Sequence, residues 1–216
     1  MKKRLLSAGV VLAMVVLVLT ACSKGTPQVK TSSKNAKDKQ VEKTKDESSS
    51  GSNEKKAPEV GKRSNPVPLG TTATFKNDYF DIDSDDSKEV DAAVSVTLSN
   101  VIRGDEAYKY LVQQNPFNEA APDGQEWMIL DVNLTLDKGD PDRAYYVSPS
   151  FDVIDSSGSE VDQKNYGTFG EGMEFGNVKI FEGGNASGKI AKLVPVGDEN
   201  LLLEFSDDAN VFFAVK

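Results

Sequence analysis

A run of alternating apolar and polar residues over positions 126–137 constrains the fold of this chain more than any other segment. Its apolar members recur at every second position and are Met128, Leu130, Val132, Leu134 and Leu136. A period of two is typical of a β-strand that buries one face. Trp127 and Ile129 interrupt the polar side near its start. An exposed Trp could mark a binding surface, but we favour packing beneath a loop or a short helix.

Shorter segments predict further strands. Residues 94–98 repeat the same alternation, and residues 151–154 precede Asp155-Ser156-Ser157-Gly158, a turn signal with Val161 beyond it, which predicts a hairpin. The remaining strand candidates are residues 173–181, 188–194, 201–205 and 211–215. Strands of this length, separated by turn residues, predict a mainly β, antiparallel β-sandwich over residues 66–216.

One short helix is expected within this series, over residues 105–114. Asp105 is placed to cap its start, and Asn115-Pro116 is placed to end it. Its expected apolar face consists of Tyr108, Leu111 and Val112.

Six short motifs in fixed order resemble a family of Gram-positive lipoproteins. They are RGDEAY (103–108), NPFN (115–118), PDGQEW (122–127), AYYVS (144–148), FDVIDSSG (151–158) and FEGG (181–184). The members carry a telokin-like, immunoglobulin-like domain related to a secreted immunoprotective antigen. The resemblance covers about residues 69–205 and implies an immunoglobulin-like sandwich in the cell envelope, without an assigned activity. The chain departs from the family pattern between Asn165 and Met173, so the strand register there stays open.

The segment before the sandwich has a different composition. Residues 23–65 contain no Leu, Ile, Met, Phe, Tyr or Trp and are rich in Lys and Ser. Such a segment buries too little apolar surface to offset the entropy of ordering. Residues 22–65 are therefore predicted to be a disordered tether.

Residues 1–21 have the layout of an export signal, with Lys2, Lys3 and Arg4 before a 15-residue, largely apolar run. A helix of that length is about 22 Å long, which is short of the roughly 30 Å hydrocarbon core of a bilayer. The next residues, Leu19-Thr20-Ala21-Cys22, resemble the lipobox of bacterial lipoproteins. The resemblance implies cleavage between Ala21 and Cys22 and attachment of lipid, such as palmitate, to the Cys22 thiol. The alternatives are an ordinary signal peptide that ends by chance at a cysteine, and an uncleaved membrane anchor.

Composition excludes several kinds of chemistry. The chain has no histidine and one cysteine. It therefore has no Ser-His-Asp or Cys-His site, and it cannot form a disulfide within one chain. Residues 65–216 hold 11 Lys and Arg against 28 Asp and Glu, a net charge of −17 that disfavours nucleic acid. We expect no catalytic residues, no metal ligands and no cofactor.

Three acidic clusters are candidate sites. Asp81, Asp83 and Asp85 resemble the start of a calcium loop, but Asp86 stands where an EF-hand needs Gly and Ala92 stands where it needs Glu. Whether the acidic stretch 81–91 binds calcium stays open. Two sets could supply a carboxylate pair for glycoside hydrolysis, and they are Glu119, Asp123 and Glu126, and Asp137, Asp140 and Asp142. With so many acidic residues, near neighbours are expected by chance.

The expected function is recognition outside the cell. The chain is interpreted as a lipoprotein held to the extracytoplasmic face of the cell membrane through Cys22, with a non-catalytic module that binds a protein or cell-wall ligand. The candidate binding surface combines Tyr145 and Tyr146 with Tyr166 and Phe169 in a loop rich in Gly and aromatic residues. The alternative for these rings is filling the ends of the sandwich. The alternative function is an accessory or sensor subunit that docks on a membrane protein, and a wall glycan hydrolase is the weakest option.

Overall fold

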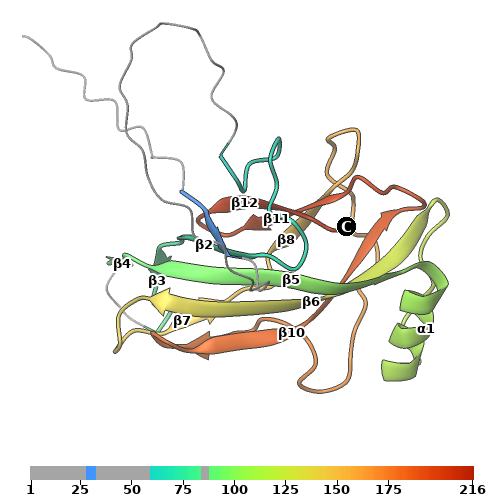
Figure 1. Cartoon of the computed structure of the whole chain (residues 1–216). Coiled ribbons are helices and arrows are strands. Elements are labelled where there is room, and N and C mark those ends of the chain that lie inside the picture. Colours follow the sequence, from blue (N-terminus) through green and yellow to red (C-terminus); the bar gives the residue numbers. More distant parts are fainter. Residues whose placement is uncertain (1–27, 33–58, 84–87) are drawn as a thin grey trace, which may run out of the picture.

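The computed structural model describes residues 28–32, 59–83 and 88–216, and its body consists of two antiparallel sheets (Figure 1). The first sheet has the order β1-β2-β5-β6-β10, and its strands are β1 Lys30–Ser32, β2 Thr72–Lys76, β5 Ala93–Arg103, β6 Gln125–Lys138 and β10 Asn185–Pro195. The second has the order β12-β11-β8, and its strands are β8 Phe151–Ile154, β11 Leu202–Ser206 and β12 Asn210–Ala214. Two short ribbons pair β3 Tyr79–Phe80 with β4 Glu89–Val90, and β7 Tyr145–Val147 with β9 Val178–Ile180. The prediction of a mainly β sandwich is confirmed.

The main core lies between the two sheets. The apolar side of β6 contributes Leu130, Val132 and Leu134, each at most 1% exposed. Phe75 of the larger sheet packs edge-on against Phe205 of the smaller one, with ring centroids 5.6 Å apart. The predicted period-two pattern thus places its apolar half between the layers and its polar half on the outer face of the larger sheet.

The helix α1 Gly104–Gln114 lies at one end of the long strands (Figure 1). Its bounds agree with the prediction, but the cap does not. Arg103 is the N-cap residue, and no side chain bonds to the free amides. Asp105 instead lies in the first turn, where a carboxylate interacts favourably with the helix dipole. At the other end, the amide of Asn115 donates to the carbonyl of Leu111 at 2.8 Å.

Part of the expected tether belongs to the fold. Residues 30–32 form β1, which pairs with β2 at the edge of the larger sheet. Val29 packs against the main core beside Gly61, whose φ of +90° suits glycine. Residues 61–67 bond to β12, through Phe212 N–H to Gly61 O at 2.9 Å and Val67 N–H to Phe212 O at 2.8 Å. These contacts correct the prediction of disorder at residues 28–32 and 59–65, while the rest of the tether lies outside the described residues.

The strand expected over residues 173–181 is divided in two. Residues 173–175 run beside β10 through a bridge between Glu174 and Lys189, and only residues 178–180 form β9. Gly176 and Asn177 separate the two parts, with φ values of +92° and +56° that an extended strand does not allow.

Candidate functional site

A second, smaller core fixes α1 to the outer face of the larger sheet. It contains Ala107 and Leu111 of α1, Trp127 and Ile129 of β6, and Leu193 of β10. The Trp127 indole N–H donates to the carbonyl of Glu119 at 3.0 Å. The prediction that Trp127 packs beneath a loop or a helix is confirmed, and the break in the polar side of β6 marks where the helix covers the sheet.

The loop over residues 163–173 lies against this helical end. Gly167 is in close contact with α1 and β10, since a Cβ placed there would lie 2.7 Å from the Ala191 side chain and 3.1 Å from that of Leu111. The rings of Phe169 and Tyr110 pack with their centroids 6.3 Å apart. The segment left open in the sequence is therefore a loop without strand pairing up to residue 173, held by packing.

Asn118 fastens this loop to the segment that follows α1. Its side chain is 6% exposed, and its amide donates to the carbonyls of Leu111 and Thr168, each at 2.8 Å. Its side-chain oxygen accepts the amide of Thr168 at 2.9 Å. Asn115 adds a side-chain bond to the Thr168 hydroxyl at 2.7 Å. Residues 115–118 and the loop over residues 163–173 are far apart in sequence and are thus joined into one surface, the platform.

Two aromatic side chains project from this platform into solvent. Phe117 is 90% exposed and Tyr166 is 80% exposed. Tyr166 was predicted as part of the binding surface, whereas Phe117 was not. The sequence does carry one indication that Phe117 is exposed. It lies in a polar turn directly after the end of the helix, where a ring has little to pack against.

The other predicted members of the surface do not join Tyr166. Phe169 is half-buried against Tyr110, while Tyr145 and Tyr146 lie in β7 at the opposite end of the long strands (Figure 1). Tyr145 is 2% exposed, so the expectation of a shared aromatic surface is wrong for this residue. Tyr146 is half-exposed and donates its hydroxyl to the side-chain oxygen of Asn177 at 2.9 Å.

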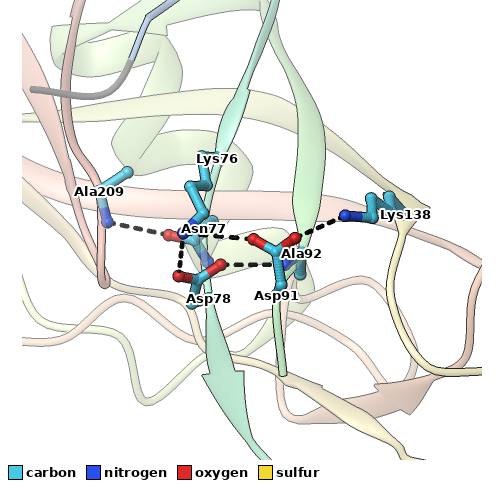
Figure 2. A network of polar contacts seen from close by, with 7 residues as sticks. All are labelled: Lys76, Asn77, Asp78, Asp91, Ala92, Lys138 and Ala209. Carbon is cyan, nitrogen blue, oxygen red and sulfur yellow. Dashed lines mark hydrogen bonds and ion pairs between the residues drawn. The ribbon is translucent and has the colours of Figure 1, made fainter. Parts of the chain in front are cut away.

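Tyr145 belongs instead to a buried polar network. Its hydroxyl donates to Asp207 at 2.8 Å and accepts from the amide of Asn77 at 3.1 Å. Burial, followed by the charge of Asp207, raises the pKa of Tyr145. Figure 2 shows that the Asn77 side-chain oxygen accepts the amide of Ala209, at 3.0 Å, and that Asp91 forms ion pairs with Lys76 and Lys138 nearby. These contacts join segments that are distant in sequence.

A cleft of about 430 Å³ lies where the polar side of the larger sheet meets the end of the loop. Its lining comprises Thr97, Ser99, Asp131, Val132, Asn133, Gly172, Met173, Ser187, Gly188 and Lys189. The strand register places Ser99, Asp131 and Lys189 in one row across β5, β6 and β10. It places Thr97, Asn133 and Ser187 in the next row.

The charges in the cleft are paired with each other. Lys189 donates to one carboxylate oxygen of Asp131, and Asn100 donates to the other at 2.7 Å. Partial burial raises the pKa of Asp131, but the bonds from Lys189 and Asn100 outweigh it, so the net pKa lies below its usual value. The Lys189 ammonium also lies 5.7 Å from the centroid of the Tyr110 ring. The ion pair is therefore fixed in place before any ligand arrives.

The acidic candidates have other partners. Glu126 pairs with Arg103 at 2.6 Å, and Asp140 accepts the amide of Asp142 at 2.9 Å within a turn. Asp81 accepts the amide of Asp83, which itself pairs with Lys179 at 2.6 Å. Asp85 lies outside the described residues. Across residues 28–32, 59–83 and 88–216, no three acidic or cysteine side chains are grouped as a metal site would require.

Ala21 and Cys22, the predicted cleavage and lipidation site, also lie outside the described residues. In the described part of the chain, no helix has the length and apolar character needed to cross a membrane. No protein-family model, no curated protein and no solved structure matches this chain.

Proposed function

We propose that this chain is a bacterial lipoprotein, anchored through Cys22 on the extracytoplasmic face of the membrane, whose β-sandwich is a non-catalytic recognition module. The anchor part is supported by the motif at residues 19–22 after a basic and apolar start. The recognition part rests on one structural observation, the exposed pair Phe117 and Tyr166 on a fastened platform.

A single exposed apolar residue is ordinary, because more than half of a typical protein surface is apolar. Phe117 and Tyr166 differ from such residues because hydrogen bonds hold the segments that carry them in place. The two segments that carry the rings are bonded through Asn118, which is almost fully buried. A ring on a fixed segment loses little conformational entropy when a ligand covers it. Aromatic side chains are also the commonest source of strong contacts at interfaces.

The charge of the domain favours a ligand other than the bilayer. Residues 65–216 carry a net charge of −17, which anionic head groups repel. A wall component or an envelope protein avoids that repulsion if its contact surface is neutral or basic. The platform would then be the recognition surface, and the lipid on Cys22 would supply the attachment to the membrane.

Binding of purified protein to isolated cell envelopes tests the recognition part. The double variant Phe117→Ala/Tyr166→Ala should bind at least about tenfold more weakly than the wild-type protein, since an aromatic contact at an interface contributes about 1 kcal/mol or more. Phe181→Ala is the matched control, because Phe181 is also an exposed ring but follows β9 at the other end of the fold. Undiminished binding of the double variant would overturn the proposed surface.

Crosslinking in intact cells separates recognition from the alternative role. Capture of wall material by the wild-type protein supports the recognition module, whereas one reproducible membrane-protein partner indicates an accessory or sensor subunit. In the same cells Cys22→Ser should accumulate as an uncleaved precursor, and normal maturation of that variant would refute the lipid anchor.

A further inference from the structure

We propose that the cleft between the larger sheet and the loop end at Gly172 and Met173 binds a neutral saccharide. The proposal deepens the recognition role proposed above and rests on it for the source of the ligand. It is carried by the chemistry of the two polar rows, by the pairing of the two charges and by the apolar wall at Met173.

The floor of the cleft offers donors and acceptors together. Thr97, Ser99 and Ser187 supply hydroxyls, and Asn133 supplies an amide that donates and accepts. Two of these groups also have protein partners, since the Thr97 hydroxyl bonds to that of Thr72 at 2.8 Å and the Asn133 side-chain oxygen accepts from Asn185 at 3.0 Å. Within the described part of the chain, the hydroxyls of Ser99 and Ser187 have no hydrogen-bond partner and can turn either way toward a ligand. Such groups repeat about every 4.8 Å across the strands and about every 7 Å along them. A ligand with many hydroxyl groups on a ring can bond to several of them at once.

The charges select against ions. Asp131 and Lys189 are the two charged side chains in the lining, and they pair with each other. An anion would compete with Asp131 for the ammonium and would also meet the −17 charge of the domain. A cation would have to displace Lys189 from the one carboxylate present. A neutral ligand leaves the pair intact and can bond to its unused donors and lone pairs.

The backbone around the cleft selects against an extended peptide. A peptide that adds to a sheet needs an edge strand with free amides and carbonyls. The edge of β10 is occupied, because Lys189 N–H donates to Met173 O at 2.8 Å and Phe175 N–H donates to Lys189 O at 3.0 Å.

One wall of the cleft is apolar. Met173 contributes a flexible, polarizable thioether that can lie against the C–H face of a sugar ring. Apart from Val132 and the two glycines, the remaining lining residues are polar, so an apolar ligand would leave the hydroxyls of Ser99 and Ser187 without partners. A saccharide ring has both an apolar C–H face and polar hydroxyls, and therefore matches both parts of the cleft.

The full chain, purified in detergent, can be tested with three neutral probes, namely cellotetraose, maltotetraose and N-acetylglucosamine tetraose, by saturation-transfer NMR and calorimetry. We expect at least one to bind, and Asn133→Ala/Ser187→Ala to weaken that binding by about tenfold or more, because each lost hydrogen bond accounts for a factor of roughly 2 to 10. Thr135→Ala is the matched control, since Thr135 lies on the same face of β6 but does not line the cleft. It should bind like the wild-type protein.

Failure of all three probes to bind the folded chain would overturn the proposal, as would binding that the double variant leaves unchanged. If the double variant does not fold, Ser187→Trp at an exposed position fills the cleft and must block binding. The outcome is independent of the platform, because Phe117 and Tyr166 do not line the cleft. Undiminished envelope binding by Phe117→Ala/Tyr166→Ala would count against the platform alone, and failure of the saccharide probes would count against the cleft alone, so the two failures are distinguishable.

Discussion

The buried pair of Asn77 and Tyr145 shows how single side chains hold distant segments of this chain together. Asn77 follows β2, Tyr145 lies in β7, and their shared partner Asp207 lies in the turn between β11 and β12. The Asn77 side-chain oxygen also accepts the amide of Ala209 at 3.0 Å. Leaving a buried donor or acceptor of such a network without its partner costs about 1–3 kcal/mol.

Tyr145→Phe should lower the free energy of unfolding by about 1–2 kcal/mol at neutral pH, because Asn77 and Asp207 lose a partner while the ring stays packed. The variant should also change how the free energy of unfolding depends on pH. The folded-state pKa of Tyr145 is raised above the value of about 10 expected for the unfolded chain. The contribution of the Tyr145 hydroxyl to the free energy of unfolding is therefore fully present below pH 10 and is lost as pH rises from there toward the folded-state pKa.

Urea unfolding between neutral and alkaline pH measures both effects. Above about pH 10 the stability of the wild-type protein should fall more steeply than that of Tyr145→Phe, by up to about 1.4 kcal/mol per pH unit. Tyr146→Phe is the control, since its hydroxyl lies at the surface, and it should stay within about 0.5 kcal/mol of wild type. Parallel alkaline slopes for Tyr145→Phe and wild type would contradict the buried role of the hydroxyl.

Tyr145 and Tyr166 also show that the exposure of a single side chain cannot be predicted from its neighbours in sequence. Both are tyrosines beside small or aromatic residues, yet one is 2% exposed and the other 80%. The difference comes from contacts that are remote in sequence. Tyr145 meets Asn77 and Asp207, while nothing covers the ring that stands on the Asn118 platform. Local pattern carries no information about such partners.

At the scale of elements, prediction succeeded where a strand is long and has one apolar face. The alternation in β5 and β6 and the apolar positions of β10 are readable because each strand spans at least 11 residues. β3 and β4 have two residues each, too few to show a period. Ion pairs of Asp91 with Lys76 and Lys138 lie beside them. The cleft was not predicted, since its rows come from three strands whose register the sequence does not specify.

Gly188 determines how the loop end meets β10. A Cβ at this position would lie 2.5 Å from the backbone nitrogen of Phe175 and 2.6 Å from the carbonyl of Glu174. Gly188→Ala should therefore push residues 173–175 off the strand edge and cost about 1–3 kcal/mol. The Lys189 amide, which donates to Met173, should then exchange with solvent faster.

Denaturant unfolding and amide hydrogen exchange measure this prediction, and Gly170→Ala is the control in the same loop. A Cβ at Gly170 would meet its nearest neighbour, the end of the Gln114 side chain, at an ordinary 3.4 Å. The control should change stability by less than about 0.5 kcal/mol. Equal stability of Gly188→Ala and Gly170→Ala would show that residues 173–175 move away without cost.

At the scale of the whole molecule, β1 changes how far the domain can stand from its proposed anchor. Six Cα–Cα steps separate Cys22 from Gln28, and they can span at most about 22 Å. A coil over the 37 steps from Cys22 to Glu59 would have a root-mean-square span of about 30–36 Å. With a lipid on Cys22, as proposed, docking of β1 on β2 would replace a long tether by a short one and hold the sandwich close to the membrane.

Val29→Asp should release β1, because Val29 packs against the main core and a charge there loses solvation without gaining a partner. The amides of β2 that face β1 should exchange faster, and in vesicles the domain should move away from the bilayer. Energy transfer from a dye on Lys216→Cys to a lipid acceptor measures the second effect. Thr31→Asp, which adds the same charge at an exposed position of β1, should resemble wild type in both measurements. Faster exchange in Val29→Asp without a change in energy transfer would show that β1 does not set the distance to the membrane.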